Sequence, residues 1–124
     1  MAHRFRTPGY HPIRKLRVIL SGLHAAVVTD FSVAYKVILS IPVLGLSFFF
    51  RQWIDASLIL LAVGLMLISE LFNSAIELLC DFVESQQNEQ IRVIKDIAAA
   101  AAGLSILVWA AILGIESIRL VQIR

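Results

Sequence analysis

Three long apolar segments, residues 32–50, 56–83 and 91–120, constrain the fold of this chain more than any other feature. Each is long enough for a helix that crosses about 30 Å of hydrocarbon. Hydrophobic residues make up 59% of the 124 residues and charged residues only 16%, a balance unlike that of soluble domains. Because lipid offers no partner to the backbone, spanning segments of this length are helical. The sequence predicts an all-α membrane protein with three transmembrane helices in a single domain over residues 1–124.

The chain begins with a polar lead-in over residues 1–12, and we expect an amphipathic helix over residues 13–30. A basic amphipathic helix can lie in the interface of an anionic leaflet. The alternative is that this segment is simply the start of the first span. Basic residues gather in this part of the chain: Arg4, Arg6, Arg14, Lys15 and Arg17.

These basic residues also predict an orientation. By the positive-inside rule, the N-terminus lies in the cytoplasm, and three spans then place the C-terminus outside. Lys36, near the start of the first span, is expected to snorkel to the cytoplasmic interface. Pro42, in the middle of that span, is expected to kink the helix. Residues 51–55 are expected to form a short outer turn.

Four polar residues recur along one side of the second apolar segment: Glu70, Asn73, Glu77 and Asp81. At about 100° per residue, offsets of three, seven and eleven fall within one narrow stripe of a helix. Ionisable groups inside a membrane segment are functional candidates. Glu70 lies deepest, where a carboxylate can act as a general base. The acids nearer to water are of the type that binds Mg²⁺.

The residues after the second segment can complete a phosphate site. A polar connection over residues 84–90 leads to Lys95 and Asp96, and a lysine can meet a phosphate as a point charge. No GxxxxGK[ST] or GxGxxG motif is present, so a nucleotide site here would differ from a P-loop or a protein kinase. The alternative is that the acids are solvated helix ends or subunit contacts.

After its charged first turns, the third segment carries small residues over positions 98–103, which allow helix backbones to approach closely in lipid. Three helices make a thin bundle in which a polar stripe is hard to bury. This favours an oligomer. Cys80 is the only cysteine, so an intrachain disulfide is excluded.

The string ELFNSAIELLCD, followed after a short polar connection by KDIAAAAAG, resembles the bacterial integral-membrane diacylglycerol kinase family, which includes undecaprenol kinases. The resemblance extends from Gly22 to the end of the third apolar segment. It implies a homotrimer of three-span protomers in the bacterial cytoplasmic (inner) membrane, each with an amphipathic surface helix. It also implies active sites between protomers near the cytoplasmic face, where the γ-phosphate of MgATP passes to a lipid hydroxyl.

The same resemblance implies roles for individual residues. Glu70 would be the general base on the lipid hydroxyl. Asn73 would position phosphate or substrate, and Asp81 would contact the nucleotide. Lys95 would hold the β- and γ-phosphates, with Asp96 supporting the nucleotide site.

Mg²⁺ is the implied cofactor, with Glu77 as a metal ligand. The family usually has a glutamate and, four residues later, an arginine where this chain has Asp30 and Ala34. Asp30 would take the place of the glutamate as a metal ligand.

Three hypotheses follow for the function. The first is a lipid kinase, with diacylglycerol as the favoured acceptor giving phosphatidic acid, and undecaprenol as the alternative acceptor. The second is a non-catalytic trimeric lipid-binding protein, which the changes at Asp30 and Ala34 favour and the complete polar stripe opposes. The third is a small ion or metabolite carrier, which the lack of polar residues in the outer half of the spans opposes. No feature favours a nucleic-acid partner.

Overall fold

The computed structural model describes residues 12–83 and 88–123, which form four helices. Three of them are long and apolar enough to cross a membrane, which confirms the predicted all-α membrane class. The trimer and the amphipathic character of the first helix stay predictions, and most of the polar lead-in lies outside the described residues. The helices are α1 (Pro12–Thr29), α2 (Phe31–Phe49), α3 (Trp53–Val83) and α4 (Glu89–Ile123).

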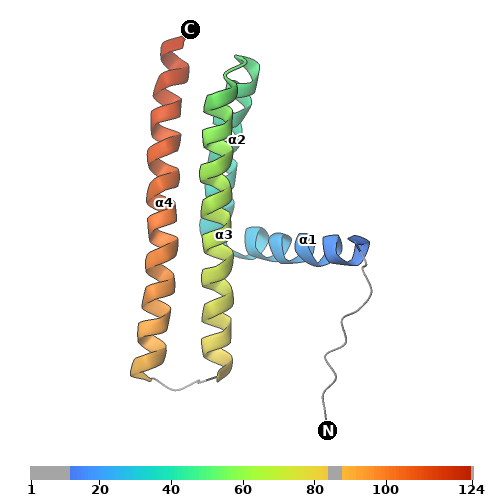
Figure 1. Cartoon of the computed structure of the whole chain (residues 1–124), viewed down its shortest axis with the longest axis vertical. Coiled ribbons are helices and arrows are strands. Elements are labelled where there is room, and N and C mark those ends of the chain that lie inside the picture. The colour runs from blue at the N-terminus through green and yellow to red at the C-terminus, as the bar shows by residue number, and fades with distance from the viewer. Residues whose placement is uncertain (1–11, 84–87, 124) are drawn as a thin grey trace.

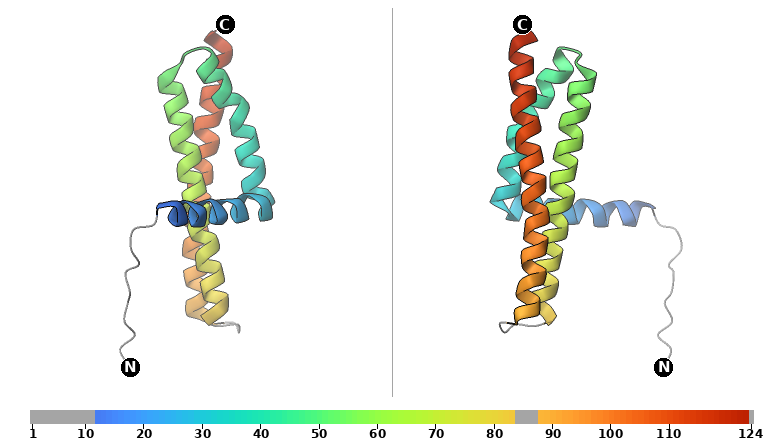
Figure 2. Two further views of the ribbon diagram at one scale, coloured as in Figure 1. Left: turned by 90° about the vertical axis from the view of Figure 1, so that its right-hand side faces the viewer. Right: turned by 60° about the vertical axis from the view of Figure 1, so that its left-hand side comes forward.

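Helices α3 and α4 run side by side along their whole length, and α2 packs against the part of α3 nearest the C-terminal end of α4 (Figures 1 and 2). Helix α1 projects sideways from the bundle at a steep angle. At 1.5 Å per residue, the 31 residues of α3 and the 35 of α4 measure about 46 Å and about 52 Å. Both helices therefore exceed the thickness of the hydrocarbon, and they extend past the level of α1.

Asp30 makes the corner between α1 and α2. Its backbone is extended, with φ −110° and ψ 104°, and its carboxylate accepts a hydrogen bond from the backbone N–H of Ser32 at 2.9 Å. This is the geometry of a helix N-cap. The predicted first helix over 13–30 ends one residue early because Asp30 caps the next helix.

The connection between α2 and α3 is shorter than the predicted turn over residues 51–55. Arg51 adopts a left-handed φ of 57°. The backbone N–H of Arg51 donates to the carbonyl of Phe48 at 3.1 Å, and that of Gln52 to the carbonyl of Ser47 at 2.8 Å. This Schellman pattern closes α2 within two residues, so Trp53 already begins α3. Helix α2 continues through Pro42.

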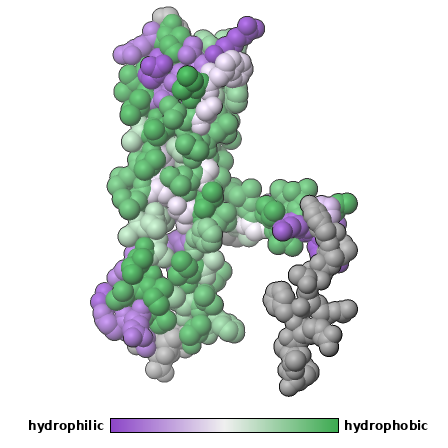
Figure 3. All heavy atoms as spheres, viewed as in Figure 1, coloured by the Kyte–Doolittle hydropathy of each residue, from purple (hydrophilic) through white to green (hydrophobic). Residues whose placement is uncertain are grey.

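Small and apolar side chains fill the contact between α3 and α4. Ala56, Ile59, Ala62 and Met66 are buried on α3. The buried residues of α4 include small residues and one tryptophan at helical spacing: Ala98, Ala102, Ser105 and Trp109. Large apolar side chains remain exposed over most of the face in Figure 3, and polar ones gather toward the two ends. This distribution fits a bundle surrounded by lipid or by other apolar helices.

Candidate functional site

The polar stripe of α3 passes from a buried residue to exposed ones, as its spacing predicted. Glu70 is 9% exposed, Asn73 is half-buried, and Glu77 and Asp81 are exposed. Glu70 faces the start of α2, and the other members continue along α3 toward its end at Val83. One helix face thus carries polar groups from the interior of the bundle to its end.

Lys36 lies inside the bundle, so the expectation that it snorkels to the interface is wrong. Its side chain is 1% exposed, and its Nζ lies 3.5 Å from Oε2 of Glu70 and donates to Oγ of Ser32 at 2.6 Å. The same Nζ lies 5.3 Å from the ring centre of Tyr35. A charged group stays in an apolar interior when a partner of opposite charge is there. The packing of α2 on α3 provides that partner.

Asn73 and Glu77 are joined along α3. The Nδ2 of Asn73 donates to Oε1 of Glu77 at 3.3 Å. The Oδ1 of Asn73 is buried and has no hydrogen-bond partner among the described residues. Buried amide oxygens are normally satisfied, so this one is available to a donor from a ligand or another subunit.

Lys95 joins the stripe from α4. Its Nζ donates to Oδ1 of Asp81 at 2.6 Å, with the lysine half-exposed and the aspartate exposed. The stripe and the predicted phosphate-binding lysine therefore lie together, although the two residues are on different helices.

The model of the prokaryotic diacylglycerol kinase family matches residues 17–116 of this chain. The chain belongs to this family. No curated protein and no solved structure showed significant similarity. The matched region contains the whole stripe, Lys36 and Lys95. Family membership points to a lipid kinase of the diacylglycerol or undecaprenol kinase kind, in agreement with three membrane-length helices.

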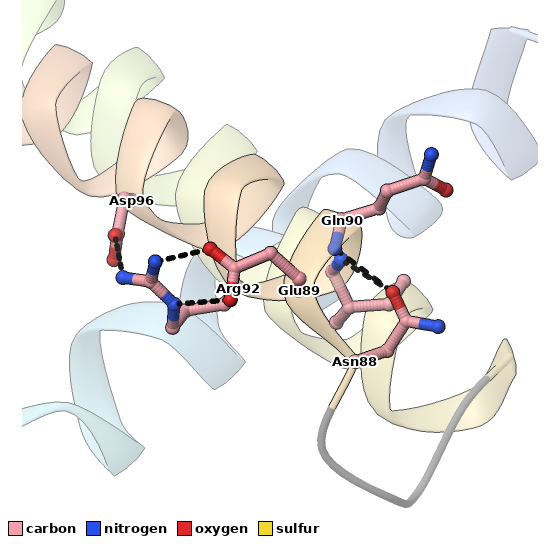
Figure 4. A network of polar contacts seen from close by, with 6 residues as sticks. Asn88, Glu89, Gln90, Arg92 and Asp96 are labelled. Carbon is pink, nitrogen blue, oxygen red and sulfur yellow. Dashed lines mark hydrogen bonds and ion pairs between the residues drawn. The ribbon is translucent and has the colours of Figure 1, made fainter.

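Asp96 lies beside Lys95 in the sequence but is paired with another residue (Figure 4). Its Oδ2 lies 3.4 Å from an Nη of Arg92, which also contacts Glu89 one turn earlier. All three side chains are exposed. Asn88 caps α4 by accepting a hydrogen bond from the backbone N–H of Gln90 at 2.8 Å. This network orders the first turns of α4, from which Lys95 reaches the stripe.

The two predicted metal ligands are Glu77 and Asp30. The carboxylate of Asp30 is engaged as the cap of α2, and that of Glu77 accepts from Asn73. Within residues 12–83 and 88–123, no group of three or more His, Cys, Asp and Glu side chains is placed to hold a metal. Ligation of Mg²⁺ by these residues stays a prediction.

Lys36 is the site residue that the sequence analysis did not identify. A lysine within an apolar segment was the available signal, since such residues mark functional sites by default. Its position near the start of the segment made snorkelling the simpler interpretation. Lys36 and Glu70 are 34 residues apart in the sequence. They meet only because α2 packs against α3.

Proposed function

We propose that this protein is an ATP-dependent lipid kinase that transfers the γ-phosphate of MgATP to the hydroxyl of a membrane lipid, with diacylglycerol as the favoured acceptor. The supporting observation is the order of groups along one surface. A buried carboxylate, Glu70, is followed by an amide and two further carboxylates that end at Lys95 on the neighbouring helix. A lipid hydroxyl and a polyphosphate need such a gradient from the apolar side to the aqueous side.

Glu70 acts as the general base. The lipid hydroxyl gives its proton to Glu70 as its oxygen bonds to the γ-phosphorus, and the bond from that phosphorus to ADP breaks. Phosphoryl transfer depends mainly on positioning and charge stabilisation. Asn73 contributes to positioning, since its buried Oδ1 can accept a hydrogen bond from the substrate.

Lys95 holds the β- and γ-phosphates. In this structure its charge is balanced by Asp81 at 2.6 Å. Because both side chains reach solvent, a polyphosphate can approach the ammonium and replace or share this contact. Asp81 then contacts the nucleotide, and Asp96 acts more remotely by holding Arg92 at the start of α4.

Glu77 and Asp30 are the candidate Mg²⁺ ligands. Their oxygens suit the ion, which would supply charge neutralisation of the phosphates when bound. Mg²⁺ usually takes one or two carboxylates and completes its shell with phosphate oxygens and water, so a pair of protein ligands is a sufficient donor set. Asp30→Asn separates its two roles, since asparagine caps a helix as well as aspartate does.

The site is completed in a homotrimer in the bacterial inner membrane, with the N-terminus and the stripe on the cytoplasmic side. Support comes from the large apolar side chains left exposed on all four helices and from the unsatisfied Oδ1 of Asn73. The basic residues of α1 favour contact with an anionic leaflet. Undecaprenol is the alternative acceptor, because both lipids present one hydroxyl at the interface.

The test is transfer of labelled phosphate from ATP, with Mg²⁺, to a panel of diacylglycerol, undecaprenol and a monoacylglycerol. Wild type is compared with Glu70→Gln and with Glu116→Gln, which makes the same change at a buried glutamate near the opposite end of the bundle. We expect one labelled lipid, lost in Glu70→Gln and kept in Glu116→Gln.

A folded oligomer that labels none of the three lipids would favour the non-catalytic lipid-binding protein. Thermal unfolding with and without MgATP further separates the lipid kinase from the non-catalytic lipid-binding protein, because a ligand that binds only the folded state raises its stability. The kinase predicts stabilisation by MgATP, weakened in Lys95→Met.

A further inference from the structure

Lys36 is the most buried charged side chain of the described residues, at 1% exposure. Its ammonium is held by two side chains, Oγ of Ser32 at 2.6 Å and Oε2 of Glu70 at 3.5 Å. The ammonium is therefore shielded from solvent, and Glu70 is its ion-pair partner.

A buried ion pair is weak evidence of a stabilising role. Replacing such a pair by apolar side chains of similar size is often neutral or stabilising. The partner here is the carboxylate at the deepest point of the stripe, which is the proposed general base. A general base must be correctly aimed before the hydroxyl arrives.

We propose that Lys36 is a positioning residue that holds Glu70 as an oriented carboxylate for the transfer step. This inference rests on the proposed kinase function and adds a residue to it. The distance from Nζ of Lys36 to Oε2 of Glu70 is 3.5 Å, whereas the distance from the same Nζ to Oγ of Ser32 is only 2.6 Å. The lysine is thus fixed mainly from its own helix and presents its charge to Glu70 across the gap between α2 and α3.

The backbone of Lys36 is held as well as its side chain. Its carbonyl accepts a hydrogen bond from Oγ of Ser40 at 2.7 Å, and that Oγ accepts one from Nε1 of Trp109 at 2.7 Å. All of these groups are buried. Helix α4 therefore supports the segment of α2 that carries Lys36, and all three long helices take part in placing one ammonium against Glu70.

The test compares wild type, Lys36→Met and Lys36→Arg as purified oligomers, with Lys15→Met as the matched change of an exposed lysine on α1. For Lys36→Met we expect kcat to fall by about tenfold or more, in line with the cost of misplacing a catalytic group. KM values for ATP and lipid should change by less than about twofold, since Lys36 does not touch either substrate. Lys36→Arg, which keeps the cation, should recover most of kcat.

Ser32→Ala removes the short anchor of Nζ while leaving the charge in place, so it should lower kcat less than Lys36→Met does. Ser32→Ala also tests the positioning role of Lys36 if the Lys36→Met protein does not assemble. In that case an unchanged kcat in Ser32→Ala would refute the proposal.

Full kcat in folded Lys36→Met, with only a change in thermal stability, would show a purely structural pair. A rise in KM at unchanged kcat would show that Lys36 binds substrate, which also overturns the inference. Absence of kinase activity in wild type would instead overturn the proposed function itself.

Discussion

Arg119 is predicted to stabilise the end of the bundle opposite to the polar stripe. Its Nε lies 3.1 Å from Oδ1 of Asp55 and 3.9 Å from Oε2 of Glu116. The two carboxylates are 4% and 2% exposed, whereas the side chain of Arg119 is 54% exposed. One half-exposed guanidinium therefore serves two buried carboxylates, and it joins the first turn of α3 to the last turns of α4.

The loss of folding stability expected for Arg119→Met lies between two limits. At an effective dielectric constant near 20, the gross attraction of charges 3.1 Å apart is about 5 kcal/mol, before any desolvation is counted. Exposed pairs contribute about 0–1 kcal/mol, and removing one partner of a fully buried pair costs about 3–5 kcal/mol. Because the carboxylates are buried and the guanidinium is half-exposed, Arg119→Met should destabilise the protein by about 2–3 kcal/mol.

The measurement is the unfolding midpoint in mixed micelles titrated with denaturing detergent. Arg92→Met is the control, since Arg92 also contacts two carboxylates on α4 but all three side chains are exposed; it should leave the unfolding midpoint close to that of wild type. In a Glu116→Gln background, Arg119→Met should cost about 1 kcal/mol less than in wild type, because fewer unpaired charges remain. Equal effects of Arg119→Met and Arg92→Met would refute the reasoning.

Three further predictions concern stability and the metal. Trp109→Phe removes the donor to Ser40 and should cost about 1 kcal/mol in the same unfolding assay; a neutral result would show that this hydrogen bond adds no net stability. Arg51→Gly should stabilise the protein by about 0.5–1 kcal/mol, because glycine adopts the left-handed φ of 57° without a steric penalty, and a loss of stability would contradict the turn geometry. Asp30→Ala should lower stability by about 1 kcal/mol through loss of the cap. Asp30→Asn should keep that stability yet raise the Mg²⁺ concentration needed for half-maximal kinase activity, and an unchanged Mg²⁺ requirement would exclude Asp30 as a ligand.

Hydropathy and helical spacing were sufficient to predict the number of long helices and the order of burial along the stripe. Both properties depend on neighbours within a few turns of the same helix. Glu70 is therefore the deepest member in the sequence and in the structure. The boundaries at Asp30 and Arg51 were less accurate, because each depends on hydrogen bonds of the cap or turn itself.

The sequence by itself determined that this chain forms three membrane-length helices, which side of the second carries the polar residues, and the family to which the chain belongs. The tertiary structure decided the charge pairs. Lys36 meets Glu70 across 34 residues, Lys95 meets Asp81 across 14 and Arg119 meets Asp55 across 64. These partners depend on the axial register of one helix against another, which is set by how small and large side chains interlock along the whole interface. Local periodicity carries no information on that register, so Lys36 could be recognised as part of the site only after the helices were packed.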